Sequence, residues 1–246
     1  MIALRILLDI IICFVCIFIT YVLFLCVCTA TVKNKNYDVN SRFYRGLLTF
    51  NSKIGLAFCN VKIHLSGEEK LNGIGRFLIV QNHRSNFDPI ITWCVLKKYD
   101  IAFISKKQNF SVPIFGKIAR KCCFRDIDRE NARNAIITLR DCAELMRNDV
   151  VSIGVYPEGT RSKKKEMGAF HDGVLKIAKM AGVPIVVSAV RGTEKVHKRA
   201  PFKRTHLYVD ILEVIEPEKV AEQSSHELSA EIYGKISGFI EENDKD

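Results

Sequence analysis

The stretch FLIVQNHRSNFDPI, residues 77–90, joins a short apolar run to a polar turn and then to a proline. The run at 77–80 consists of large and β-branched side chains, which predicts a buried strand. Pro89 is a residue type favoured at the first helical position, so a helix is expected over 89–98, with Asp88 as its N-cap. The stretch therefore predicts a strand–turn–helix unit.

His83 and Asp88 both lie in this turn, five residues apart. On one continuous helix they would point about 140° apart, but a helix that starts at Pro89 leaves them in a turn where they can meet. An aspartate that accepts a hydrogen bond from one imidazole nitrogen leaves the other nitrogen available as a base. A structural histidine satisfied within a polar turn explains the same pattern, and the local residues leave both interpretations open.

Short β-type runs alternate with helical patterns through the rest of the chain. Strands are expected at 77–80, 101–104, 150–156, 184–190 and 207–214, and helices at 89–98, 131–147, 173–181 and 224–241. This alternation predicts a single α/β domain with a mixed, mostly parallel sheet flanked by helices. Ligands of such sheets bind beyond the carboxyl ends of the strands, so the turns after 80 and 155 are expected at one edge.

An uncharged apolar run at residues 10–32 precedes this domain. As a helix it would be roughly 34 Å long, enough to cross a hydrocarbon core of about 30 Å. The run is longer than the usual h-region of about 7–15 residues and Asp9 precedes it, so a retained membrane segment is favoured over a cleaved signal peptide. More cations follow the run than precede it, which places the domain on the cytoplasmic side of a membrane. These are Lys33, Lys35, Arg42 and Arg45 after the run, against Arg5 before it.

Residues 42–58 mix aromatic, aliphatic and cationic side chains. This pattern predicts an amphipathic helix at the membrane interface, with a core helix of the domain as the alternative. The expected organisation is therefore a pair of membrane-anchoring helices at 1–59 and an α/β domain at 60–246.

The composition favours anionic partners, since 37 Lys and Arg against 27 Asp and Glu leave a formal charge of +10. Nucleic acid, acidic lipid and phosphorylated small molecules all fit such a charge, but no nucleic-acid-binding signature is present. The nine cysteines lack the spacing of a zinc site or a disulfide framework, so no metal is expected.

A second polar segment, VYPEGTRSKKK at residues 155–165, suits a phosphate group. Glu158 and Arg161 flank Gly159 and Thr160, and a guanidinium can bind two phosphate oxygens at once. The lysines at 163–165 are interpreted as solvated charges or as an attraction for anionic lipid. Upstream, Asp128 is expected to cap a helix whose first turn carries Arg129.

Taken in order, these segments resemble the glycerolipid acyltransferase family. NHRSNFD at 82–88 matches its NHxxxxD motif, IDR at 127–129 resembles its second block, YPEGTRS at 156–162 its FPEGTRS block, and VPIV at 183–186 its fourth. The similarity runs from about residue 60 to 215 and is greatest to the 1-acylglycerol-3-phosphate acyltransferase branch. Tyr156 replaces the usual Phe, and Val187 stands where the family often has a second Pro.

The resemblance implies transfer of an acyl chain from acyl-CoA or acyl carrier protein to lysophosphatidic acid, without a cofactor, to give phosphatidic acid in a membrane. It implies that His83 is the general base and that Asp88 orients it. The oxyanion also needs hydrogen-bond donors; backbone amides near 83–86 are candidates, but the sequence does not name the donors. The residues implied to bind the glycerol phosphate are Glu158, Gly159, Thr160, Arg161, Arg129 and Lys106. Other lysophospholipids or glycerol 3-phosphate remain alternative acceptors, and a membrane-bound hydrolase with Ser85 as nucleophile is an alternative activity. The oligomeric state stays open.

Overall fold

The computed structural model describes residues 2–162 and 166–244, so the lysine run at 163–165 lies outside the described residues. Seven strands form one sheet in the order β1-β7-β6-β2-β5-β3-β4. Every neighbouring pair is parallel except β6 and β7, which confirms the mixed, mostly parallel sheet. The strands are β1 (Val61–Ser66), β2 (Leu78–Gln81), β3 (Ile101–Lys106), β4 (Arg125–Ile127), β5 (Ser152–Val155), β6 (Ile185–Arg191) and β7 (Thr205–Ile215).

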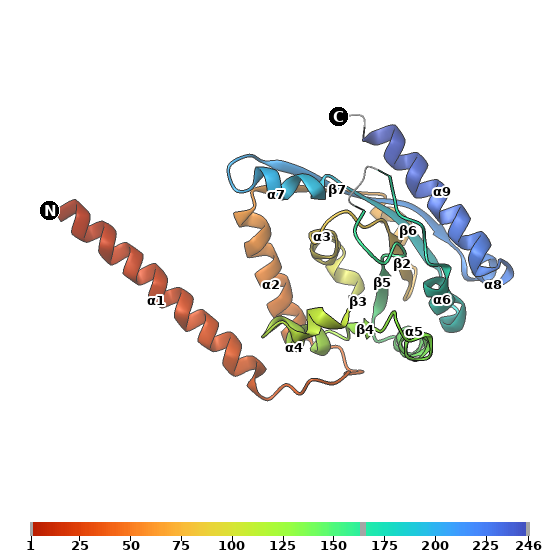
Figure 1. The fold of residues 1–246 in the computed structure, drawn as a ribbon, viewed down its shortest axis with the longest axis horizontal. Coiled ribbons are helices and arrows are strands. Elements are labelled where there is room, and N and C mark those ends of the chain that lie inside the picture. The colour runs from red at the N-terminus through yellow and green to blue at the C-terminus, as the bar shows by residue number, and fades with distance from the viewer. Residues whose placement is uncertain (1, 163–165, 245–246) are drawn as a thin grey trace.

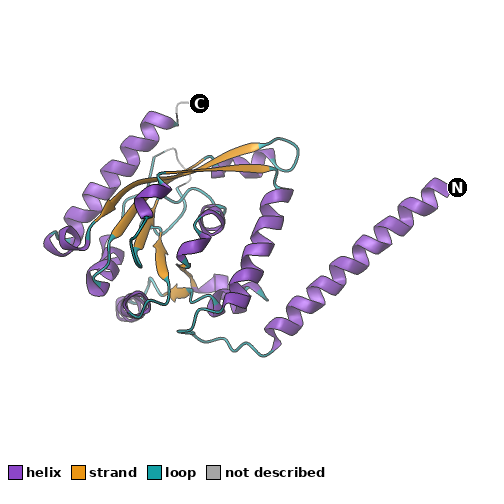
Figure 2. Cartoon of the chain, turned by 180° about the vertical axis from the view of Figure 1, so that it is seen from behind, coloured by secondary structure: helices purple, strands orange, loops and turns teal. Residues whose placement is uncertain are grey.

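Helices cover both faces of this sheet (Figures 1 and 2). Helices α2, α3 and α4 lie on one side, and α5, α6 and α9 on the other (Figure 1). Their bounds are α1 (Ile2–Ala30), α2 (Arg42–Phe58), α3 (Asp88–Val95), α4 (Phe115–Lys121), α5 (Ala132–Arg147), α6 (Lys176–Ala181), α7 (Val196–Arg199), α8 (Pro217–Glu222) and α9 (Ser225–Asn243). Strand β2 is central, and all its residues are buried, as expected for a parallel strand covered on both faces.

Strands β1 and β4 were not expected from the sequence. The short β4 begins at Arg125. Arginine side chains are mostly exposed, but this one is only 1% exposed. Asp141 and Asp38 pair with this guanidinium at 2.5 and 2.6 Å. The carboxylates compensate the desolvation of the arginine, which allows a polar segment to enter the sheet.

Two helix starts differ from expectation. Helix α3 begins at Asp88 itself, whose side chain caps no amide of the helix. Helix α5 begins at Ala132 and is capped by Asn131. The Asn131 side chain accepts hydrogen bonds from the N–H groups of Arg133 and Asn134, at 3.1 and 3.2 Å. Asp128 is therefore not the cap, and Arg129 lies in the preceding loop. The helix expected over 224–241 is confirmed as α9, and Ser224 and Glu227 form a capping box at its start.

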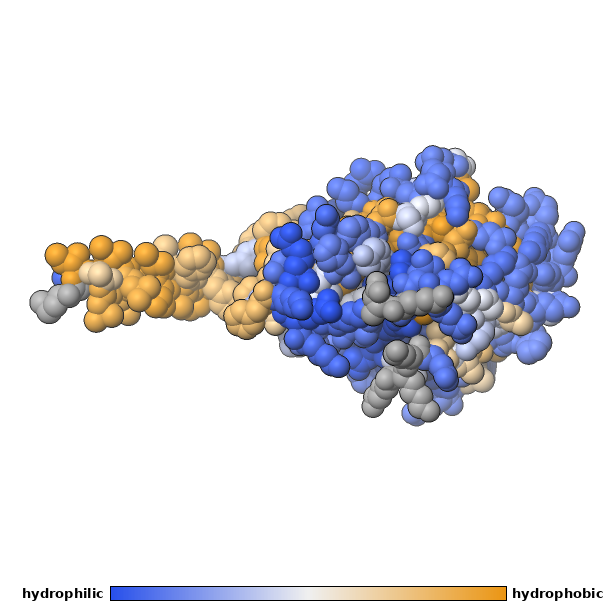
Figure 3. Space-filling view, turned by 90° about the horizontal axis from the view of Figure 1, so that it is seen from above, coloured by the Kyte–Doolittle hydropathy of each residue, from blue (hydrophilic) through white to orange (hydrophobic). Residues whose placement is uncertain are grey.

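Among the residues that the structure describes, one helix, α1, is long and apolar enough to cross a membrane. It projects from the body as a hydrophobic rod (Figure 3). Helix α2 packs against the domain through buried Arg45 and Leu56, and presents Phe50, Ile54 and Phe58 to the outside. Arg45 donates to the carbonyl of Ile101 at 3.1 Å, so this cation belongs to the domain interior. The division of the chain at residues 59 and 60 stays a prediction.

Candidate active site

His83 and Asp88 meet in the turn between β2 and α3. The imidazole Nδ1 lies 2.8 Å from Oδ2 of Asp88, whose side chain is completely buried. The same oxygen accepts the backbone N–H groups of Arg84 and Ser85, both at 2.7 Å, and Oδ1 accepts the Thr193 hydroxyl at 2.5 Å. Four donors therefore hold the carboxylate, and the carboxylate holds the ring. Because Nδ1 is occupied and His83 lines a cavity, Nε2 is the nitrogen left for a substrate.

Asn82 fixes the start of this turn. Its Oδ1 accepts the N–H of Val190 at 2.7 Å, and its Nδ2 donates to the carbonyl of Val190 at 2.9 Å. Backbone pairing of β2 with β6 extends to Gln81. Beyond it, the side-chain amide of Asn82 makes the hydrogen bonds to the backbone of β6. The chain can therefore leave the sheet at His83 without an unpaired polar group on β6.

Glu158 lies behind the same turn rather than in the cavity. Its Oε1 accepts the backbone N–H of His83 at 2.6 Å, and its Oε2 accepts the N–H of Gly168 at 2.8 Å and the hydroxyl of Ser162. The residue is 5% exposed. We expected Glu158 to contact the glycerol phosphate, but its carboxylate points toward the backbone N–H groups of His83 and Gly168.

The backbone amides of the turn are already committed. The N–H of His83 donates to Glu158, and those of Arg84 and Ser85 donate to Asp88. Of the candidate donors near 83–86, these three N–H groups already have carboxylate acceptors. Ser85 is 2% exposed and its Oγ accepts the N–H of Phe87 at 3.3 Å, so it is not presented as a nucleophile.

The candidate phosphate-binding residues converge from three adjacent strands. Lys106 ends β3, Arg129 follows β4, and the loop of Gly159, Thr160 and Arg161 follows β5; all five line the same cavity as His83. Burial lowers the pKa of Arg129 below its ordinary value, which is so high that the guanidinium remains charged. The edge of the sheet therefore presents three cations to one space.

Gly159 allows two side chains to approach the backbone of this loop. Its φ of +69° lies in the left-handed region, and a Cβ there would come within 3.2 Å of His171 and 3.3 Å of Arg129. Arg129 also donates to the carbonyl of Gly159. His171, which lines the cavity as well, was missed by sequence reasoning, because its position depends on the loop folding back so that its N–H donates to Pro157.

Tyr156 packs against the imidazole of His83. Its ring stacks on His83 with centroids 4.4 Å apart and an interplanar angle of 25°, and it is also stacked with Phe103. Burial, followed by the charge of Asp88, raises the pKa of Tyr156 well above its ordinary value, so the phenol stays neutral. A phenylalanine would provide the same stacking surface.

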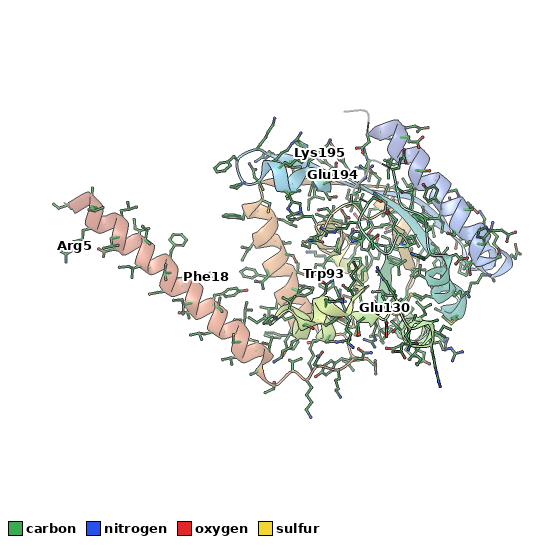
Figure 4. All side chains as sticks on the ribbon, in the orientation of Figure 1. Arg5, Phe18, Trp93, Glu130, Glu194 and Lys195 are labelled. Atoms are coloured by element: carbon green, nitrogen blue, oxygen red, sulfur yellow. The ribbon has the colours of Figure 1, made fainter. Side chains whose placement is uncertain are left out.

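The cavity has a volume of about 1090 Å³, above the usual range of roughly 300–1,000 Å³ for small-molecule sites. Its polar lining contains His83 and the three cations. Much of the remaining lining is apolar, including Leu56, Trp93, Phe103, Phe124 and Leu139. Trp93 (labelled in Figure 4) reaches from α3 to α2, where its Nε1–H donates to the Thr49 hydroxyl at 2.9 Å. One space can therefore hold an anionic group, a long apolar chain and a base.

Comparisons with known proteins agree with this geometry. The Acyltransferase family matches residues 62–191, more than half of the chain. The chloroplastic 1-acyl-sn-glycerol-3-phosphate acyltransferase LPAT1 of Arabidopsis thaliana is 34% identical over 136 residues, which are 55% of this chain and 37% of that protein. The 1-acyl-sn-glycerol-3-phosphate acyltransferase of Escherichia coli is 27% identical over 175 residues, 70% of each chain.

The crystal structure of the 1-acyl-sn-glycerophosphate acyltransferase PlsC from Thermotoga maritima has the same fold, with a TM-score of 0.70 and 21% identity over 92% of this chain and 90% of that one. This likeness confirms the architecture. The family match contains the whole His83–Asp88 turn and the loop of Glu158 to Arg161. The chain therefore belongs to the Acyltransferase family.

Proposed function

We propose that this protein transfers an acyl chain from acyl-CoA or acyl carrier protein to the sn-2 hydroxyl of 1-acylglycerol 3-phosphate, which is lysophosphatidic acid, to give phosphatidic acid. The observation that carries the proposal is the single cavity in which His83, three cations and an extended apolar lining meet. The relatives named above carry 1-acyl-sn-glycerol-3-phosphate acyltransferase in their names, which supports this acceptor.

In the proposed mechanism, Nε2 of His83 takes the proton of the sn-2 hydroxyl while that oxygen attacks the thioester carbonyl. Asp88 stabilises the imidazolium that forms, as a buried carboxylate does in comparable His–Asp pairs. Collapse of the tetrahedral intermediate breaks the carbon–sulfur bond, and the leaving thiolate takes the proton back. The histidine is regenerated, so the reaction requires neither a metal nor a redox cofactor.

The phosphate of the acceptor is proposed to lie among Lys106, Arg129 and Arg161, with the backbone of Gly159 and the hydroxyl of Thr160. Guanidinium groups suit this role because they bind two phosphate oxygens at once. Glu158 holds the turn from behind and acts as a positioning residue. The apolar lining accommodates an acyl chain, whose burial is favourable in proportion to its area.

The proposed acceptor and the proposed product are both membrane lipids. We propose that α1 anchors the protein, and that the exposed cations after α1, Lys33, Lys35 and Arg42, keep the catalytic domain on the cytoplasmic face. The exposed apolar side chains of α2 then lie at the bilayer interface, while the opposite side of this helix lines the cavity. Acceptor lipid can therefore reach the site laterally, without transfer through water.

A thiol-release assay with acyl-CoA or acyl carrier protein tests the proposal, with lysophosphatidic acid, glycerol 3-phosphate and lysophosphatidylcholine as competing acceptors. We expect release to be fastest with lysophosphatidic acid and to be lost in His83→Ala, with Ser85→Ala as the control that retains it. Preference for another acceptor would refute the assigned substrate. Full activity of His83→Ala would refute the mechanism.

A further inference from the structure

The segment between β6 and β7 contains the short helix α7 and the loop at residues 200–204. At the tip of this loop, Phe202 is 94% exposed, the most exposed large hydrophobic side chain among the described residues. Single exposed apolar residues are normal on protein surfaces, so the ring alone indicates no partner. The neighbouring cations and the contact of the loop with α2 indicate the kind of partner.

Cations surround Phe202 on both sides in sequence. Residues 195–204 contain five Lys and Arg and no acid. Lys198, Lys203 and Arg204 are exposed, and the N–H of Lys203 closes the loop by donating to the carbonyl of Arg199 at 2.8 Å. Hydrophilic side chains gather on the body beside the apolar rod of α1 (Figure 3). The loop therefore combines one protruding aromatic ring with a local positive charge.

The loop is attached to the end of α2. The N–H of Thr205 donates to the carbonyl of Asn60 at 3.1 Å, and the side chain of Arg204 donates to Asn60 Oδ1 at 3.3 Å. Val196 of α7 is buried in a small apolar cluster with Leu56 of α2. Phe58, the last residue of α2, is 74% exposed. The loop thus continues the exposed apolar surface of α2, on the side of the body that faces α1 (Figure 1).

We propose that this loop is a membrane contact in addition to α1 and α2. Phe202 enters the headgroup region, and Lys198, Arg199, Lys203 and Arg204 bind the phosphates of anionic lipid. Aromatic rings favour the interface, and each cation near an anionic surface raises the local affinity roughly fivefold. His197 of α7 contacts Phe87, which lines the cavity, so this contact brings the cavity close to the lipid surface.

The inference rests on the membrane part of the proposed function and is independent of the acceptor and of the chemistry. An acidic acyl carrier protein is another partner for a basic surface. Lipid is favoured here because Phe202 protrudes from the charged surface and adjoins the apolar side chains of α2.

Fluorescence quenching of the full chain in liposomes tests the contact. The protein has one tryptophan, Trp93, which is 4% exposed and lines the cavity, so its contribution is measured in the parent chain under the same conditions and subtracted. Phe202→Trp places a reporter at the loop, and His226→Trp places a matched one on α9, where the side chain is 88% exposed. With brominated lipids, we expect quenching of Phe202→Trp above the parent chain, increased by phosphatidylglycerol, and no such increase for His226→Trp.

Adding Lys198→Gln and Lys203→Gln to the Phe202→Trp chain is expected to reduce the increase caused by phosphatidylglycerol, because two of the four proposed lipid-binding cations are removed. Quenching equal to that of the parent overturns the proposal. The proposal is also overturned if Phe202→Trp shows no quenching and the variant with Lys198→Gln and Lys203→Gln loses activity in detergent only with acyl carrier protein. That result would assign the loop to binding of acyl carrier protein. Because His83→Ala removes transfer but leaves the reporter in place, failure of the chemistry is distinguishable from failure of the lipid contact.

Discussion

Replacing Glu158 by Gln preserves the shape of the side chain but removes its charge and one of its two acceptor oxygens. In the native chain, Oε1 accepts from His83 N–H at 2.6 Å and Oε2 accepts from Gly168 N–H at 2.8 Å. The Gln side chain has one carbonyl oxygen and one NH2 group. Whichever way the amide is oriented, its NH2 group faces a backbone N–H that it cannot satisfy.

The magnitude follows from the burial of this residue. At 5% exposure, water cannot replace the lost acceptor, and an unsatisfied buried donor costs about 1–3 kcal/mol. For a chain of this size, such a loss of unfolding free energy lowers the melting temperature by about 2–12 °C. The turn that carries His83 also loses its anchor, and a displacement of about 1 Å at a catalytic group can reduce kcat roughly 100-fold.

Melting temperature, kcat and the KM for lysophosphatidic acid should be measured together on Glu158→Gln. The matched control is Glu166→Gln, the same charge change at an exposed position of the same loop. We expect Glu158→Gln to lower kcat and melting temperature with little change in KM, and the control to resemble the parent. An unchanged melting temperature and kcat with a strongly raised KM would refute the reasoning, because it would identify Glu158 as a substrate contact.

Thr193→Val removes the hydroxyl that donates to Asp88, and kcat from initial rates should fall roughly 10- to 150-fold, since hydrogen bonds to charged groups contribute about 1.5–3 kcal/mol; an unchanged kcat would contradict this role. Arg129→Ala should raise the KM for lysophosphatidic acid roughly 10- to 100-fold by the loss of a phosphate contact, measured by initial rates, whereas an effect on kcat alone would argue against it. Burial raises the pKa of Cys122 and of Cys142 to about 12, so both thiols should resist iodoacetamide at pH 8 until the protein is denatured, as read by mass spectrometry.

Much of the architecture was predictable because its signals are local. The apolar run of β2 and the proline at the start of α3 lie within a few residues of each other, and the capping box of α9 spans four positions. The α/β alternation also placed the His83 turn and the Glu158 loop at one edge, since parallel strands end at the same side of a sheet. That expectation is confirmed by the pairing of β2 with β5.

The roles of individual side chains were less predictable. Asp88 resembles a helix cap in the sequence, but its carboxylate turns back to the preceding amides and to Thr193, 105 positions away. The positive charge of Arg125 argues against a buried strand at this position, but Asp141 of α5 pairs with the guanidinium. In both cases a distant partner changes the preference that the local residues would have.

The sequence by itself determined the class of fold and the apolar first helix, because composition, periodicity and turn residues act over short distances. The residues proposed to carry the chemistry came from the motifs at 82–88 and 156–162, through their resemblance to a known family. Only the tertiary structure decided which way each functional group points. Glu158 supports the His83 backbone across 75 positions of the chain, and His171 reaches Gly159 by a folded loop. Such contacts depend on strand order and on the desolvation of whole groups, and these are set when the sheet assembles.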